Sequence, residues 1–151
     1  MKHMNRRMKL AYFCYLSNVI VFSLIGLTFV FAGEFFPFHS DIIQTSWGDL
    51  DTAAQTLYLG MMRTEGAGFL ASAVAIGILF FIPFRRGEIW ACWAMSCIGI
   101  VEHLPTLFAN VYVSMTTAAT PPWPIPLVGI ILLIMGLVLA IHERQTNTAG
   151  Q

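Results

Sequence analysis

The stretch LYLGMMRTEGAGFLASAVAIGILFFIPF, residues 57–84, decides the class of this protein. It is an almost continuous apolar run, longer than the roughly 20 helical residues that cross a bilayer core of about 30 Å. Arg63 and Glu65 interrupt the run, although ionisable side chains are costly inside a membrane and tend to be paired or functional there. The stretch therefore predicts a transmembrane helix that carries part of a polar site.

Three further apolar segments of similar length lie at about 10–33, 89–113 and 123–141. Of the 151 residues, 57% are hydrophobic and 11% are charged, whereas an average soluble domain has about 25% charged residues. This composition excludes a disordered chain, a basic nucleic-acid-binding domain and an ordinary cytosolic enzyme. We expect one all-α membrane domain over residues 1–151, a four-transmembrane-helix antiparallel bundle.

The placement of charged residues predicts the orientation of this bundle. Basic residues gather near both termini and in the turn after residue 84, namely Lys2, Arg6, Arg7, Lys9, Arg85, Arg86 and Arg144. The loop at 34–56 carries the acids Glu34, Asp41, Asp49 and Asp51 and no Lys or Arg. Because Lys and Arg favour the cytoplasmic side, we expect cytoplasmic N- and C-termini in a multi-pass protein of the cell inner membrane.

Short motifs predict where the helices end. Pro83, followed by Arg85-Arg86-Gly87, is typical of a helix end and a tight turn. Ser46-x-x-Asp49 resembles a capping box and predicts a helix start above the membrane. The segment 126–141 has no polar side chain, so we expect the fourth helix to act as scaffold.

Packing between helices is indicated by small residues four positions apart in the second segment. The pairs are Gly68/Ser72, Ala67/Ala71 and Ala71/Ala75. Such pairs let a neighbouring backbone approach closely where lipid removes the hydrophobic driving force. Cys14, Cys92 and Cys97 form no CxxC motif, so we expect small buried hydrophobes rather than a disulfide or a zinc site.

Four ionisable residues are predicted to share one level of the membrane. Arg63 and Glu65 lie six and eight residues past Leu57, about 9–12 Å below the outer edge at 1.5 Å per residue. Glu102 and His103 lie 13 and 14 residues past Ile89, which places them about 20 Å up from the inner edge. With Asn110 above them on the third helix, and Glu34 and His39 at the outer mouth, they are predicted to line one outward-opening polar pocket.

The charges in this predicted pocket do not cancel unless a proton is shared. We expect an Arg63–Glu102 ion pair, with Glu65 or His103 as the group that titrates. Pro105 removes a backbone donor and is expected to kink the helix beside Glu102. Three interpretations remain open: a structural ion-pair network, a binding pocket, or a catalytic or proton-relay site formed by Glu65, Glu102 and His103.

The predicted ligand of a binding pocket is a lipid-like molecule, a quinone or another small hydrophobic compound. The residues predict no metal and no cofactor, because Glu102 and His103 are adjacent rather than in the Glu-x-x-His spacing of di-metal bundles. Haem ligation would need a second histidine at the depth of His103, and His39 and His142 lie elsewhere. The expected partners are membrane lipids, a second copy of the chain or a larger membrane complex, and no nucleic acid. If the protein is an enzyme, isomerase or redox chemistry with a carboxylate acid/base is expected.

Several motifs together resemble a known kind of protein. They are Pro37-Phe38-His39, Ser46-Trp47, the run from Leu59 to Gly68, Pro83-Phe84-Arg85-Arg86-Gly87 with Trp90-Ala91, and Pro121-Pro122-Trp123. The chain resembles small four-helix bacterial membrane proteins of unknown function, loosely the DoxX-like and related domain-of-unknown-function families. That resemblance implies a four-helix membrane fold and supplies no catalytic residues. A more distant likeness is to the sterol-isomerase-type EXPERA family, which implies possible roles for Glu65, Glu102 and His103, although the spacing differs from that family's pattern.

Overall fold

The structure is a computed structural model that describes the backbone of residues 6–148 and side chains as far as Glu143. All of the regular structure in this range is helical. The elements are α1 (Arg6–Phe31), α2 (Pro37–Ile43), the 3₁₀ helix η1 (Trp47–Asp49), α3 (Thr52–Leu79), the π-helical turn η2 (Phe80–Phe84), α4 (Ile89–Thr116) and α5 (Pro124–Thr148). Four of them, α1, α3 with η2, α4 and α5, are long and apolar enough to cross a membrane, which confirms the prediction of four such helices.

The start of α3 differs from the prediction. The helix begins at Thr52, after the predicted capping motif at Ser46 and before the apolar segment that starts at Leu57. The Asp51 carboxylate caps it by accepting a hydrogen bond of 2.7 Å from the Ala54 backbone N–H. The predicted capping motif at Ser46 and Asp49 instead closes η1, where the serine hydroxyl donates to the aspartate carboxylate. The segment 34–56, predicted as a loop, therefore contains two short helices, α2 and η1.

The turn between α3 and α4 forms as the sequence predicts. Pro83 lies in the π-helical turn that ends the helix, and its carbonyl accepts a hydrogen bond of 2.9 Å from the Glu88 N–H. Gly87 has a φ of 83°, a left-handed conformation that glycine adopts without steric cost. Pro105 does not interrupt α4, which continues as one helix to Thr116.

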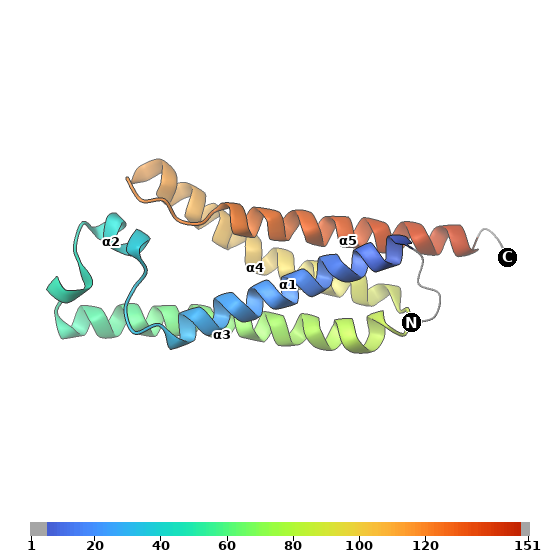
Figure 1. Cartoon of the computed structure of the whole chain (residues 1–151), viewed down its shortest axis with the longest axis horizontal. Coiled ribbons are helices and arrows are strands. Elements are labelled where there is room, and N and C mark those ends of the chain that lie inside the picture. The colour runs from blue at the N-terminus through green and yellow to red at the C-terminus, as the bar shows by residue number, and fades with distance from the viewer. Residues whose placement is uncertain (1–5, 149–151) are drawn as a thin grey trace.

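Figure 1 shows α1 crossing the bundle obliquely, from α5 at one end of the molecule to α3 at the other. Residue numbers rise along α1 while those of its partners fall along α3, since Tyr12 contacts Phe80 and Phe22 contacts Phe69. The crossing is close at Gly26, where an added Cβ would lie 2.9 Å from the carbonyl oxygen of Gly66. The absence of side chains at these two glycines allows the backbones of α1 and α3 to approach closely at this point.

The closest approach between helices does not occur at the predicted alanine pair Ala67/Ala71. Ala67 and Ala71 are exposed, so they are not the residues at which the helices approach most closely. Gly66 on α3 and Gly26 on α1 are buried and make the backbone contact instead. Adjacent positions on a helix point about 100° apart, so position 66 faces α1 while position 67 does not.

The apolar core gathers where α1 begins and α3 ends. Its largest fully buried side chains include Tyr15, Phe22, Phe80, Ile76 and Met95. Cys14 and Cys92 are buried, as predicted, whereas Cys97 is exposed, and all three cysteines are free. At the other end of α1, Phe35 of the 34–56 segment packs against Trp47 of the same segment at 5.1 Å and against Tyr58 of α3 at 5.5 Å.

Candidate functional site

The buried polar centre of the bundle is a pair formed by Asn18 of α1 and His103 of α4. Both residues are 1% exposed, and the imidazole Nε2 lies 3.0 Å from the amide Oδ1. Because an amide oxygen only accepts hydrogen bonds, Nε2 is the donor and carries a proton. The ring of Phe22 covers the imidazole at a centroid distance of 4.4 Å. The pair is thus a fixed hydrogen bond inside an apolar surrounding.

Helix α5 makes room for this pair. A Cβ on Gly129 would lie 2.1 Å from His103 Nε2, which is closer than any real Cβ contact. The prediction that this helix is only scaffold is therefore incomplete, because its glycine supplies the space that the imidazole occupies. A single backbone position on α5 determines whether His103 can reach Asn18.

A second buried polar contact lies further along the same three helices. The Tyr15 hydroxyl is 3.2 Å from the Ser96 hydroxyl and donates to the Cys92 carbonyl at 3.3 Å. Ser96 in turn donates to the carbonyl of Leu133 on α5 at 3.3 Å. Ser96 and His103 are seven residues apart and therefore lie on one face of α4. That face carries the polar side chains that hold α1 and α5 to α4.

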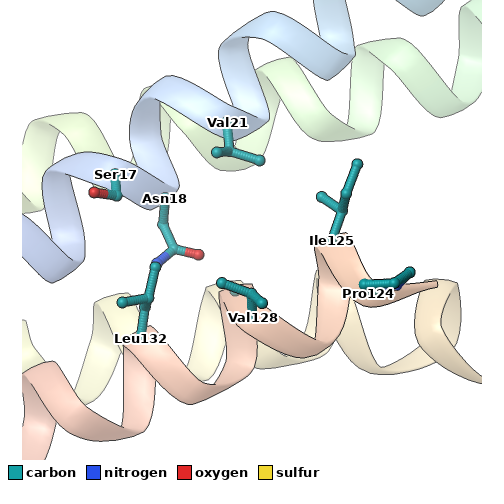
Figure 2. Close-up of a pocket in the computed structure, with 8 residues that line it drawn as sticks. Ser17, Asn18, Val21, Pro124, Ile125, Val128 and Leu132 are labelled. Carbon is teal, nitrogen blue, oxygen red and sulfur yellow. The ribbon is translucent and has the colours of Figure 1, made fainter. Parts of the chain in front are cut away.

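A cavity of about 270 Å³ lies between α1 and α5, beside the Asn18–His103 pair. It is lined by Ser17, Asn18 and Val21 of α1 and by Pro124, Ile125, Val128, Gly129 and Leu132 of α5. Figure 2 shows the Asn18 side chain extending from α1 toward α5, with the branched side chains of Val128 and Leu132 across from it. Asn18 belongs both to the cavity wall and to the buried pair, and with Ser17 it is one of two polar residues in an otherwise apolar lining.

Glu102 faces a different helix from its neighbour His103. Its carboxylate accepts a hydrogen bond of 3.0 Å from the Ser72 hydroxyl on α3, and its Oε1 would lie 3.8 Å from a Cβ on Gly68. Glu65 is exposed on the same stripe of α3 and lies within electrostatic range of Glu102. The prediction that both residues of the Glu102–His103 pair could border one cavity does not match these contacts.

The predicted Arg63–Glu102 ion pair is absent among the residues that the structure describes. Arg63 is exposed, and Glu102 bonds to Ser72 instead. Arg63 precedes Ser72 by nine residues, which is about 13.5 Å along the helix axis and half a turn around it. The arginine is therefore on the opposite face of α3 and too far toward the helix start to reach this carboxylate.

The other predicted site residues do not join either polar cluster. Asn110 is half-buried on α4, two turns beyond His103, and Glu34 is exposed after α1. His39 lies in α2, where its Nδ1 accepts a hydrogen bond of 3.2 Å from the Phe36 N–H. Burial among aromatic rings lowers the pKa of His39 below its ordinary value of 6.5. Of the seven predicted residues, only Glu65 of α3 and Glu102 of α4 lie near one another. His103 points instead toward Asn18 of α1.

Three of the polar residues in these clusters were not predicted from the sequence: Asn18, Tyr15 and Ser96. Asn18 is the one amide in the apolar segment at 10–33, and that isolation is the signal that could have singled it out. Within the part of the chain that the structure describes, no group of three His, Cys, Asp or Glu side chains is arranged to hold a metal ion. The polar side chains that line the cavity are those of Ser17 and Asn18, and His103 bonds to Asn18 without lining the cavity itself.

No family model matches this chain, and no curated protein or solved structure matches it either. The DoxX-like and EXPERA resemblances thus remain predictions from sequence motifs. The function has to be argued from the geometry of the site.

Proposed function

We propose that this protein is a small multi-pass inner-membrane protein that binds a lipid-like molecule in the cavity between α1 and α5. The observation that carries the proposal is the apolar cavity of about 270 Å³ beside the buried Asn18–His103 pair. Sites for small molecules are typically apolar pockets with a few fixed polar groups, which is the composition of this lining.

The size of the cavity limits what it receives. Pockets for drug-sized molecules span about 300–1,000 Å³, so this cavity takes part of a molecule rather than a whole phospholipid. Val128 and Ile125 are 52% and 44% exposed, which leaves the cavity open along the outer surface of the bundle. A hydrocarbon ligand would reach it sideways from the membrane, with its remaining length in the surrounding lipid.

The proposal includes an orientation. We place the four long helices antiparallel across the membrane, with the ends that carry Arg6, Arg7, Arg85 and Arg86 on the cytoplasmic side. The support is the bias of Lys and Arg toward cytoplasmic ends, together with the acidic segment 34–56 at the opposite end of α1. On this placement Pro124 and Ile125 lie toward the outer side, and the cavity opens in the outer half of the membrane.

The proposal is tested by filling the cavity. Val128→Trp places a large side chain in the opening, and Val101→Trp adds the same bulk to α4, where Val101 is 72% exposed and outside the cavity. Both variants and the wild type are purified in mild detergent, and the lipids and small hydrophobic molecules that remain bound are measured by native mass spectrometry.

We expect a bound hydrophobic molecule with the wild type and with Val101→Trp, and its loss with Val128→Trp. Equal retention by all three proteins would mean that the molecules sit on the general surface of the bundle, and the proposal would be wrong. Circular dichroism of the same samples confirms that each variant keeps its helices.

A further inference from the structure

One face of α3 is not covered by the other helices. Helix α1 packs on α3 at Gly66 and Phe69, and the Glu102 carboxylate of α4 approaches it at Gly68 and Ser72. Figure 1 shows α3 along the lower edge of the bundle, with the other long helices above it. The uncovered face consists of exposed residues spaced three or four positions apart: Gly60, Thr64, Ala67, Ala71, Val74 and Ile78.

Unlike charges lie on the two sides of this face. Arg63 and Glu65 are both exposed, and each points about 100° away from Thr64, in opposite directions around the helix. Neither has an ion-pair partner among the residues that the structure describes, and the charged group within electrostatic range of Glu65 is another acid, Glu102. Because ionisable side chains in membrane-spanning helices are usually paired, we expect their counter-charges on a second molecule.

A second copy of the chain presents these counter-charges at the correct depth. Copies inserted with one orientation are related by a two-fold axis along the membrane normal, so every residue keeps its depth. Two α3 helices that meet at Thr64 then run parallel, and each side of one helix meets the opposite side of the other, as in parallel coiled coils. Arg63 of each copy therefore faces Glu65 of the other copy, about 3 Å away in depth.

The small side chains on this face allow the two helices to approach. A Cβ added at Gly60 would meet nothing within 4 Å, so the space beside this glycine is not used within one chain. With helix axes about 8 Å apart, the Cα atoms of Arg63 and of Glu65 in the other copy would be about 9 Å apart, which their side chains can span. The Thr64 hydroxyl already donates to the Gly60 carbonyl at 2.9 Å, so it leaves no unpaired donor at the contact.

We infer that this protein forms a parallel homodimer through the uncovered face of α3, joined by two Arg63–Glu65 ion pairs between the copies. The charges favour a second copy over an unrelated helix, because the one surface supplies both signs at one depth and each sign is satisfied twice. The inference does not depend on the proposed function. The ligand cavity lies between α1 and α5, so a copy docked on α3 leaves it accessible.

Charge reversal tests the ion pairs directly. The full chain carries a donor or an acceptor dye on an added C-terminal tag, and energy transfer is measured in phosphatidylcholine vesicles as lipid dilutes the protein. Arg63→Glu and Glu65→Arg each place like charges across the interface, and each should weaken dimerisation by about tenfold or more. The double variant Arg63→Glu/Glu65→Arg restores unlike pairs and should recover most of the lost affinity, which a misfolded protein would not do.

Disulfide crosslinking tests which face is in contact. Thr64→Cys is made in a Cys97→Ser background, because Cys97 is the exposed native cysteine, and copper phenanthroline is the oxidant. Phe108→Cys in the same background is the matched control, since Phe108 is 72% exposed and lies six residues from Glu102 toward the same side of the membrane as Thr64. We expect a crosslinked dimer from Thr64→Cys and none from Phe108→Cys.

Three results would overturn the inference. The first is energy transfer no higher than random proximity at every dilution, or a double variant as weak as the single ones. The second is equal crosslinking at Thr64→Cys and Phe108→Cys, which indicates collision without a preferred face. The third is an Arg63→Glu variant that dimerises normally but loses bound anionic phospholipid in native mass spectrometry, which would assign Arg63 to a lipid head group.

Discussion

Glu102 and His103 are neighbours in the sequence and occupy two different environments. His103 is buried, bonded to Asn18 and enclosed by Phe22 and Gly129. Glu102 is half-buried beside α3, and its bond to Ser72 lies on a face that also exposes Glu65. Adjacent residues on a helix point about 100° apart. His103 is therefore enclosed between α4, α1 and α5, whereas Glu102 lies at the edge of the contact between α4 and α3. The comparison shows that polarity within a membrane helix does not by itself identify a shared site.

Substitution of the glycine beside each residue is expected to give the largest difference in the free energy of unfolding between the two environments. Gly129→Ala places a Cβ 2.1 Å from His103 Nε2, so the imidazole must move and its bond to Asn18 breaks. Overpacking together with a lost buried hydrogen bond predicts a loss of about 3 kcal/mol in the free energy of unfolding. Gly68→Ala is the control beside Glu102, where the nearest atom would be 3.8 Å away, and it should change stability by less than about 0.5 kcal/mol.

Denaturation by sodium dodecyl sulfate in mixed micelles, followed by circular dichroism, measures both variants. Similar stabilities for the two proteins would show that the space at Gly129 is not needed by His103. The surroundings of His103 would then be no more tightly packed than those of Glu102.

A smaller difference is expected from removing the polar groups themselves. His103→Leu leaves the buried amide oxygen of Asn18 without its donor and should cost about 2 kcal/mol of unfolding free energy. Glu102→Gln keeps an oxygen to accept from Ser72, so its effect should stay below about 0.5 kcal/mol.

The double variant Asn18→Leu/His103→Leu sharpens this test, because it removes both partners. It should be more stable than the sum of the two single effects predicts, with a coupling of about 1 kcal/mol. Strict additivity in the same denaturation assay would show that Asn18 and His103 do not stabilise one another.

The smallest effect is expected outside the membrane helices, at His39. Burial lowers the pKa of His39 below 6.5, and its unprotonated Nδ1 accepts the Phe36 N–H. The unfolded segment therefore binds more protons than the folded one as the pH drops, so the stability of α2 is full above pH 6.5 and declines as the pH falls toward the lower pKa of the folded state.

Fluorescence of Trp47 reports this change, because Phe35 contacts both Trp47 and His39. Between pH 7.5 and pH 5 we expect a reversible change in emission that His39→Gln abolishes. A pH response that persists in His39→Gln would assign the titration to another group.

Much of the fold could be predicted from the sequence, because it depends on local properties. Hydropathy identified the four long helices, and Gly87 after the Arg85–Arg86 pair identified the turn between α3 and α4. The start of α3 was predicted wrongly because Asp51 competes with Ser46 and Asp49 as a cap, and only the folded backbone decides which carboxylate meets a free N–H.

The candidate site was less predictable because it depends on which helices are neighbours. His103 was selected for its charge and depth, but its partner Asn18 lies 85 positions away in the sequence. Neither hydropathy nor spacing indicates that α1, rather than α3, receives this histidine. The contribution of Gly129 has no sequence signal at all, since a glycine in an apolar helix is equally consistent with general packing.

The most direct test of the account is to map where a hydrocarbon ligand touches the protein. A photoreactive probe with a diazirine on its alkyl chain is incorporated into nanodiscs with the wild-type protein, irradiated, and the labelled residues are identified by mass spectrometry. The account predicts labelling concentrated at Val21, Val128 and Leu132, which line the cavity, and competition by an excess of the same hydrocarbon without the diazirine. Labelling spread evenly over exposed positions such as Val101, Phe108 and Val138, with no competition, would contradict it.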